Sequence, residues 1–173
     1  MEQPHALTTA AHGRAVGPGA AALAVDVGGT ALKIGLVDPR GVITDGLTVA
    51  TPAAGPGVED RIVGLVAAAV EGCRQRHGHD AVAAVSAVVP GIVDEVRGLA
   101  VHSANLGWRD VPFEQKLRDR TGLPATMSHD VRAAGLAEFA DAGAAHNAVM
   151  ITIGTGIAAA PVSYTHLTLP TTP

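Results

Sequence analysis

Two short segments carry the residue types of a phosphate-binding turn, namely glycines beside a hydroxyl side chain at the end of an apolar strand. The first reads Asp-Val-Gly-Gly-Thr (26–30) and the second reads Ile-Gly-Thr-Gly-Ile (153–157). Backbone N–H groups in such turns can hold phosphate oxygens, and a carboxylate beside them, here Asp26, suits a Mg²⁺ ion held through water. Two such turns facing each other across a cleft could hold a triphosphate from both sides.

A simpler interpretation of the first turn stays open. Neither Gly-x-x-x-x-Gly-Lys-Ser/Thr nor Gly-x-Gly-x-x-Gly at a strand-to-helix junction is present. The chain after Thr30 resumes as a strand, so the glycines stand at the tip of a hairpin. Gly-Gly turns are common there because both central residues can adopt positive φ. A charged residue such as Asp26 at the end of a buried strand favours ligand binding over a plain turn.

Asp130 follows Ser128 and His129 at the expected start of a helix. The simplest role for this Asp is to cap the helix, because its carboxylate can accept backbone N–H groups and interacts favourably with the helix dipole. The same location keeps a carboxylate ionised, which a general base requires. Both roles are compatible with the sequence.

The composition narrows the class of protein. The 173 residues, 47% of them hydrophobic, suffice for one domain or for one domain plus the start of another. A net charge of −4 without a basic stripe argues against a nucleic-acid partner. No apolar run is long enough for a signal peptide or a membrane span, so we expect a cytoplasmic protein. The single cysteine, Cys73, leaves no disulfide framework and is expected to be buried on a helix.

The elements that must position these residues follow an α/β order. Apolar alternation predicts an antiparallel meander of three strands at 23–27, 30–38 and 42–51. Apolar residues spaced by three and four from Val58 to Cys73 predict an amphipathic helix that Gly78 ends. The remaining expected elements are strands at 81–89, 123–127 and 149–153, helices at 112–120 and 130–140, an irregular polar segment at 102–108, and a return strand at 157–160. The order predicts a mixed sheet with crossover helices.

Five motifs occur in the order found in the ROK family of sugar kinases, which the chain resembles over residues 21–160. They are Leu-Ala-Val-Asp-Val-Gly-Gly-Thr-Ala-Leu-Lys (23–33), Val-Val-Pro-Gly-Ile-Val-Asp (88–94), Asn-Leu-Gly-Trp (105–108), His-Asp-Val-Arg-Ala-Ala-Gly-Leu-Ala-Glu (129–138) and Ile-Gly-Thr-Gly-Ile (153–157). The resemblance implies an actin-like ATPase (ribonuclease H-like) lobe with a mixed five-stranded sheet at 21–122. It also implies the truncated start of a second, similar lobe at 123–161. Residues 1–20, which have no long apolar run, are expected to form a disordered tail.

The resemblance also implies an activity, the phosphorylation of a hexose by ATP and Mg²⁺, with glucose giving glucose 6-phosphate. Asp130 would be the base that accepts the proton of the attacking sugar hydroxyl. Asn105 would bind a sugar hydroxyl, Gly91 would allow close backbone approach, and His129, where the family most often has Asn, leaves the sugar preference open. The implied phosphate-binding residues are Asp26, Gly28, Gly29, Thr30, Gly154, Thr155 and Gly156. Lys33 is expected to be an exposed strand lysine, and Trp108 a core anchor.

The last residues break the pattern. Residues 162–173 resemble a translated sequencing adapter, and we expect them to be a non-native tail. The Glu-x-Gly-His sugar motif and the cysteine-rich zinc loop of the family do not appear. We therefore expect this fragment to be inactive, and its full-length parent to be a homo-oligomer in which a structural zinc is possible.

Three alternatives to a hexose kinase stay open. The first is a kinase for an N-acetylated amino sugar, because the residues that separate it from a glucokinase lie in the missing half. The second is a sugar-responsive transcriptional regulator of the same family, although about twenty residues before Leu23 are too few for a helix-turn-helix domain. The third is a sugar-binding module without turnover.

Overall fold

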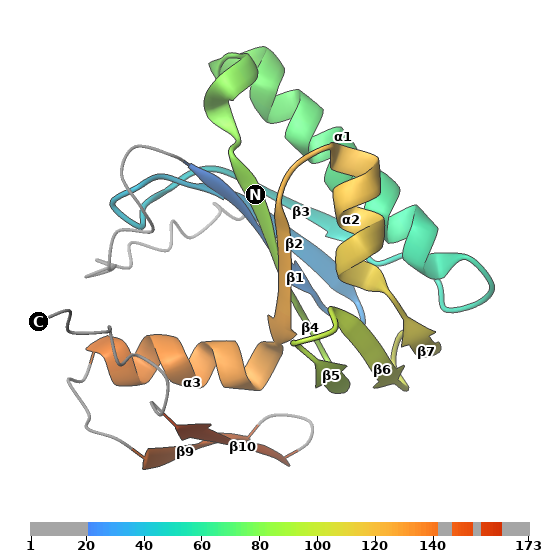
Figure 1. Ribbon diagram of the computed structural model, residues 1–173, viewed down its shortest axis with the longest axis vertical. Helices are drawn as coiled ribbons and strands as arrows, with labels where there is room; N and C mark the ends of the chain where they lie inside the picture. Colours follow the sequence, from blue (N-terminus) through green and yellow to red (C-terminus); the bar gives the residue numbers. More distant parts are fainter. Residues whose placement is uncertain (1–20, 142–146, 154–156, 164–173) are drawn as a thin grey trace, which may run out of the picture.

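The computed structural model describes residues 21–141, 147–153 and 157–163, and its largest unit is a five-stranded sheet in the order β3-β2-β1-β4-β8 (Figure 1). The strands are β1 (Ala22–Val27), β2 (Ala31–Val37), β3 (Ile43–Ala50), β4 (Ala84–Val89) and β8 (Ala125–His129). β1, β2 and β3 form the expected antiparallel meander, whereas β4 is parallel to β1 and β8 is parallel to β4. The mixed five-stranded sheet is thereby confirmed. The tail expected at 1–20 lies outside the described residues.

The position of β8 corrects the lobe boundary expected between residues 122 and 123. Its backbone pairs with β4 from Val85↔Ala125 to Val89↔His129, so it is the fifth strand of this sheet rather than part of a second lobe. The strand also begins two residues later than expected, directly after Pro124, whose carbonyl accepts the N–H of Val85 at 2.9 Å. Proline has no N–H to donate, which explains why the regular ladder starts after it.

Helices α1 (Val58–His77) and α2 (Phe113–Thr121) lie together on one face of the sheet (Figure 1). Each ends at a glycine of positive φ, Gly78 (101°) and Gly122 (68°), whose N–H donates to a carbonyl four residues earlier at 2.9 Å. The end of α1 at Gly78 is therefore confirmed. A short 3-10 turn, η1 (His79–Ala81), follows α1. Cys73 is 3% exposed in the core, as expected, and burial raises the pKa of its thiol.

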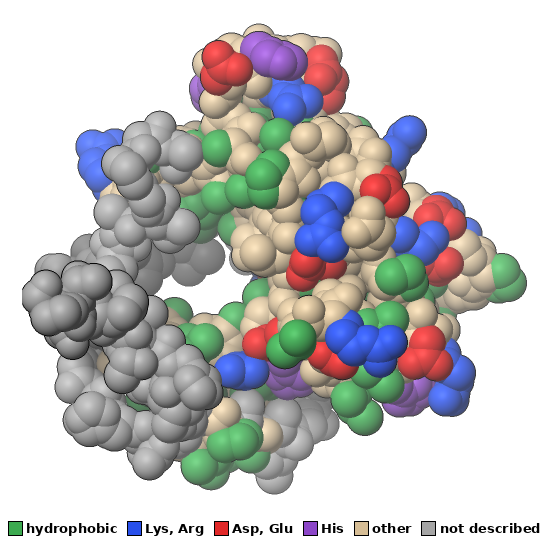
Figure 2. All heavy atoms as spheres, in the orientation of Figure 1, with side chains coloured by type: hydrophobic (Ala, Val, Ile, Leu, Met, Phe, Trp, Pro, Cys, Tyr) green, Lys and Arg blue, Asp and Glu red, His purple; other side chains and the backbone are tan. Residues whose placement is uncertain are grey.

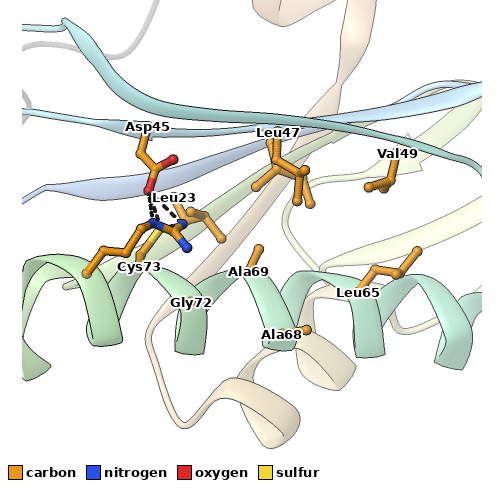
Figure 3. Close-up of a pocket in the computed structure, with 11 residues that line it drawn as sticks. Leu23, Asp45, Leu47, Val49, Leu65, Ala68, Ala69, Gly72 and Cys73 are labelled. Atoms are coloured by element: carbon orange, nitrogen blue, oxygen red, sulfur yellow. Dashed lines mark hydrogen bonds and ion pairs between the residues drawn. The ribbon is translucent and has the colours of Figure 1, made fainter.

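Helix α1 also supports β3, the strand at the open edge of the sheet (Figure 3). Leu47 and Val49 of β3 face Leu65 and Ala69 of α1 across a cavity of about 190 Å³. At one end of this cavity Asp45 Oδ2 accepts a hydrogen bond from Arg76 Nε at 2.8 Å and forms an ion pair with Nη2 at 2.6 Å. This pairing, helped by His77, holds the pKa of the Asp45 carboxyl below its ordinary value.

A second, three-stranded antiparallel sheet was missed by the sequence analysis. It consists of β5 (Ile92–Asp94), β6 (Leu99–Ser103) and β7 (Trp108–Val111) in the order β5-β6-β7. The segment 102–108, expected to be irregular, is the end of β6, a four-residue turn and the start of β7. These strands have three to five residues, too few for apolar alternation to be visible.

Trp108 is the main core anchor of this second sheet, as expected. Its side chain is 2% exposed, and the ring lies 4.7 Å from that of Phe113 with an interplanar angle of 40°. Aromatic pairs of this geometry stabilise a protein beyond their area burial. The contact fixes β7 against the first turn of α2.

A third layer contains α3 (Asp130–Asp141) and the hairpin of β9 (Asn147–Ile153) and β10 (Ile157–Ser163), drawn at the lower left of Figure 1. Ile153 pairs with Ile157, so the chain turns back here as expected. Residues 154–156, which join the two strands, lie outside the described residues, as do 164–173 of the expected non-native tail. Among the described residues, no helix combines the length and apolar character that a bilayer crossing requires.

Candidate active site

The tip of the β1–β2 hairpin is shaped by close backbone approach. Gly28 N donates to the carbonyl of Ala31 at 3.1 Å, and a Cβ on Gly28 would lie 2.7 Å from that oxygen. Neither Gly28 nor Gly29 has φ in the left-handed region, so a turn that needs positive φ is the wrong explanation for the two glycines. Glycine is required here because a side chain would not fit.

Gly29 brings a second candidate residue to the hairpin tip. A Cβ on Gly29 would lie 3.3 Å from Cβ of Asn105, which is exposed in the turn between β6 and β7. The phosphate turn and the candidate sugar residue are therefore adjacent, although 76 positions separate them in the sequence (105 − 29). Sequence spacing alone gave no sign of this contact.

Thr51, which directly follows β3, is a site residue that the sequence analysis missed. Its Oγ1 donates to the carbonyl of Gly28 at 2.6 Å, and its N–H donates to the carbonyl of Thr30 at 2.9 Å. These two bonds fix the hairpin tip from the neighbouring strand. A threonine between a strand and Pro52 was the only available signal, and it is a common one.

Asp26 and Asp130 line the same cavity, which has a volume of about 520 Å³. Its lining residues are Asp26, Val88, Asp130, Val131, Ala133, Ala134 and Thr152. Asp26 lies near the end of β1 and Asp130 directly after β8, and parallel strands bring such ends to one edge of a sheet. Thr152 comes from β9, the strand that leads to the second glycine turn. Gly154, Thr155 and Gly156 themselves lie outside the described residues.

The carboxylate of Asp130 is oriented by its own helix. Oδ1 accepts the N–H of Val131 at 2.7 Å and lies 3.4 Å from Nδ1 of His129. The capping interaction expected of Asp130 is instead made by His129, whose Nδ1 accepts the N–H of Arg132 at 3.4 Å. Asp130 is the first residue of α3, and its side chain keeps 36% of its surface exposed.

Lys33 faces Asp26 across the hairpin, with Nζ 3.4 Å from Oδ2. Its side chain is 70% exposed, as expected of a strand lysine, and it does not line the cavity shared by Asp26 and Asp130. A half-exposed carboxylate in an open cavity suits Mg²⁺, which keeps several waters and needs only one or two carboxylates. Among the described residues, no three His, Cys, Asp or Glu side chains cluster to form a complete metal cage.

Gly91 and His129 do not line this cavity. Gly91 has φ of 112°, and a Cβ there would lie 2.1 Å from the carbonyl oxygen of His102. Packing against β6 thus requires glycine at this position whatever its role toward a ligand. On the face drawn in Figure 2, acidic and basic side chains are interspersed rather than gathered into a patch of one sign.

Comparisons with known proteins agree with this geometry. A model described as the ROK family matches residues 22–168. A glucokinase of Streptomyces coelicolor is 36% identical over 137 residues, and an N-acetylmannosamine kinase of Yersinia pestis is 32% identical over 139 residues. Both alignments cover 78% of this chain, but only 41% and 44% of the relatives. The chain therefore spans about two fifths of the length of the curated relatives it matches.

A crystal structure of a ROK family glucokinase from Streptomyces griseus, in complex with glucose and AMPPNP, superimposes with a TM-score of 0.68 at 34% identity. The match covers 83% of this chain and 44% of that one. The five-stranded sheet, its helices and the third layer thus have the arrangement of the corresponding part of an actin-like sugar kinase.

Proposed function

This chain belongs to the ROK family, and on that premise we propose that the protein transfers the γ-phosphoryl group of ATP to a hexose, converting glucose to glucose 6-phosphate. The observation that carries the proposal is the cavity lined by both Asp26 and Asp130. The 36% identity to a glucokinase, and a structural relative solved with glucose and AMPPNP, support glucose as the acceptor and ATP as the donor.

Asp130 is proposed as the general base. One carboxylate oxygen is held by the N–H of Val131 at 2.7 Å, and the start of α3 favours its ionised form. In this role the carboxylate accepts the proton of the acceptor hydroxyl as that oxygen attacks the γ-phosphate. A positioned base of this kind contributes a rate factor of about 10²–10⁴.

Asp26 and the hairpin tip are proposed to hold the phosphates. When bound, a Mg²⁺ ion neutralises charge on the phosphate oxygens. Asp26 would hold that ion through water, and backbone N–H groups of the tip would donate to the phosphates. The residues proposed for this role are Asp26, Gly28, Gly29 and Thr30, together with Gly154, Thr155 and Gly156 of the second glycine turn. Gly28 and Gly29 themselves carry no side chain that would block a phosphate.

The sugar is proposed to bind beside the hairpin tip. Asn105, at the tip itself, would hydrogen-bond a sugar hydroxyl, with Gly91 and His129 completing the acceptor site. A kinase for an N-acetylated amino sugar is the second candidate, supported by the 32% identity to an N-acetylmannosamine kinase. A cytoplasmic location and a homo-oligomeric assembly are part of the proposal for the whole protein.

The test is a transfer assay on the full-length gene product with Mg-ATP and a panel of glucose, mannose and N-acetylmannosamine. We expect glucose 6-phosphate as the main product, and an Asp130→Asn variant that still binds glucose but turns over about 10²–10⁴-fold more slowly. Phosphorylation of N-acetylmannosamine alone would establish the second candidate. Sugar binding without any turnover in the wild-type protein would contradict both kinases.

A further inference from the structure

One carboxylate outside the cavity binds the backbone and side chains on both sides of Asp130. Glu95, in the turn between β5 and β6, accepts Ser128 Oγ at 2.6 Å and His129 N at 3.3 Å, both on Oε1. Its other oxygen, Oε2, accepts Nη1 of Arg132 at 2.9 Å. The bonded residues precede and follow Asp130, so Glu95 spans the junction between β8 and α3.

The turn that carries Glu95 is itself fixed. Asp94 Oδ1 accepts the N–H of Arg97 at 3.0 Å, which closes the turn. Gly98, with φ of 63°, lies so close to α2 that a Cβ there would be 2.7 Å from Cβ of Glu114. The N–H of Glu114 donates to the Gly98 carbonyl at 3.3 Å. Glu95 is therefore presented from a rigid support rather than from a free loop.

The ion pair between Glu95 and Arg132 contributes little to overall stability, because the two side chains are 29% and 46% exposed and exposed ion pairs are weak. The location of the Glu95 contacts is what distinguishes them, because the direction in which α3 leaves β8 determines where the Asp130 carboxylate lies. A displacement of about 1 Å in a reacting group can cost about 10²-fold in rate.

We propose that Glu95 is a positioning residue that holds the β8–α3 junction and thereby orients the Asp130 carboxylate. The kinetic part of this inference rests on the proposed kinase function, whereas the ordering of residues 128–132 does not. The β5-β6-β7 sheet also links Glu95 to the candidate sugar residue Asn105. β6 runs from the Glu95 turn to the turn that carries Asn105, so one strand connects the positioning residue to the side chain that lies against the hairpin tip.

The test compares Glu95→Ala and Glu95→Gln with matched controls, Glu71→Ala and Glu71→Gln, in the full-length protein. Glu71 is exposed on α1, and its Oε1 accepts a hydrogen bond from Gln75 of the same helix at 3.2 Å. Hydrogen exchange of the 128–132 amides, kcat, KM for ATP and Tm are measured for all four. Gln keeps an oxygen that can accept Ser128 Oγ and His129 N but removes the charge opposite Arg132.

Glu95→Ala should speed exchange at 128–132 by about tenfold and lower kcat by about 10–100-fold, with KM for ATP within about twofold of the wild type. Glu95→Gln should keep both the exchange rate at 128–132 and kcat close to those of the wild type. The Glu71 variants should match the wild type in both quantities. Unchanged exchange at 128–132 in Glu95→Ala would overturn the proposal. The proposal would also be overturned if Glu95→Ala and Glu95→Gln lost kcat equally and in proportion to a fall in Tm. That result would indicate a purely structural role for Glu95.

The exchange measurement also separates this inference from the proposed function. If the wild-type protein phosphorylates no sugar, the kinase proposal fails. The comparison of exchange between Glu95 and Glu71 variants then decides the positioning role alone, with faster exchange in Glu95→Ala supporting it and equal exchange rejecting it.

Discussion

The β1–β2 hairpin tip and the β8–α3 junction supply the two carboxylates of the cavity, and they are held in different ways. At the hairpin tip, glycines allow the close approach of the Ala31 backbone and of the Asn105 side chain. At the junction, charged and polar side chains reach across from another turn, with Glu95 bonding to Ser128 and Arg132. The phosphate side therefore depends mainly on glycines that admit close contacts, with one hydroxyl from Thr51, and the base side depends on charged and polar side chains.

This difference predicts which substitutions each region tolerates. Added methyl groups should harm the glycine-dependent packing, whereas the junction should respond to the loss of polar groups. The Glu95 variants test the junction, and the following variants test glycine contacts and polar contacts elsewhere in the sheet, from the largest expected effect to the smallest.

Gly91→Ala should destabilise the protein most, by about 3 kcal/mol, because its Cβ would meet the His102 carbonyl at 2.1 Å and φ is 112°. Gly64→Ala is the matched control, since a Cβ on this helical glycine meets nothing within 4 Å. That variant should be more stable than the wild type by about 0.5–1 kcal/mol. Urea unfolding gives the unfolding free energy of both variants. A change of the same sign in Gly91→Ala and Gly64→Ala would contradict the explanation from packing.

Gly28→Ala should damage nucleotide binding more than stability. The new methyl group would lie 2.7 Å from the Ala31 carbonyl, so the tip must move where the phosphates are proposed to bind. We expect KM for ATP to rise by about tenfold, a loss of about 1.4 kcal/mol in binding, while KM for the sugar changes less. Equal increases in both constants would show that the tip does not act on the nucleotide specifically.

Thr51→Val removes the hydroxyl that donates to the Gly28 carbonyl at 2.6 Å and keeps the shape of the side chain. The expected loss is about 1 kcal/mol in unfolding free energy, the contribution of a typical hydrogen bond. Thr48→Val on exposed β3 is the control and should change little. An effect at Thr48 as large as that at Thr51 would contradict a specific role in fixing the tip.

Asp45→Asn should have the smallest effect, a fall in Tm of about 2 °C or less at neutral pH. Because Arg76 and then His77 hold the folded-state pKa of Asp45 below its ordinary 3.8, the ion pair stabilises the fold above that pH. The contribution is lost as the pH falls through the folded-state pKa. Thermal scans should therefore show the difference between wild type and variant shrinking below pH 4, and a difference that grows on acidification would contradict this account.

The same contrast explains what the sequence could predict. The meander, a mixed sheet and α1 with its end at Gly78 follow from local patterns of apolar residues and glycines, whereas the number of five strands and the role of Asp130 as a base came from the resemblance to the ROK family. The β5-β6-β7 sheet was missed because its strands are too short to show a period. β8 was assigned to the wrong lobe because parallel pairing with β4 leaves no local signal in the sequence.

The missing parts of the candidate site are long-range contacts. Thr51 lies 23 residues from Gly28, and Glu95 lies 33 residues from Ser128. Hydrogen bonds of this kind form only when the fold brings distant residues together, so residue type and spacing in the sequence do not predict them. The fold brings Asp26 and Asp130 to one cavity and Asn105 to the hairpin tip beside Gly29.

The central claim is that the cavity lined by Asp26 and Asp130 is where phosphoryl transfer occurs. The most direct measurement is a crystal structure of the full-length protein with glucose, Mg²⁺ and a non-hydrolysable ATP analogue. We predict a glucose hydroxyl within about 3 Å of an Asp130 oxygen, with the metal and the phosphates on the Asp26 side of the same cavity. Sugar and nucleotide bound elsewhere, with neither carboxylate near them, would contradict the account.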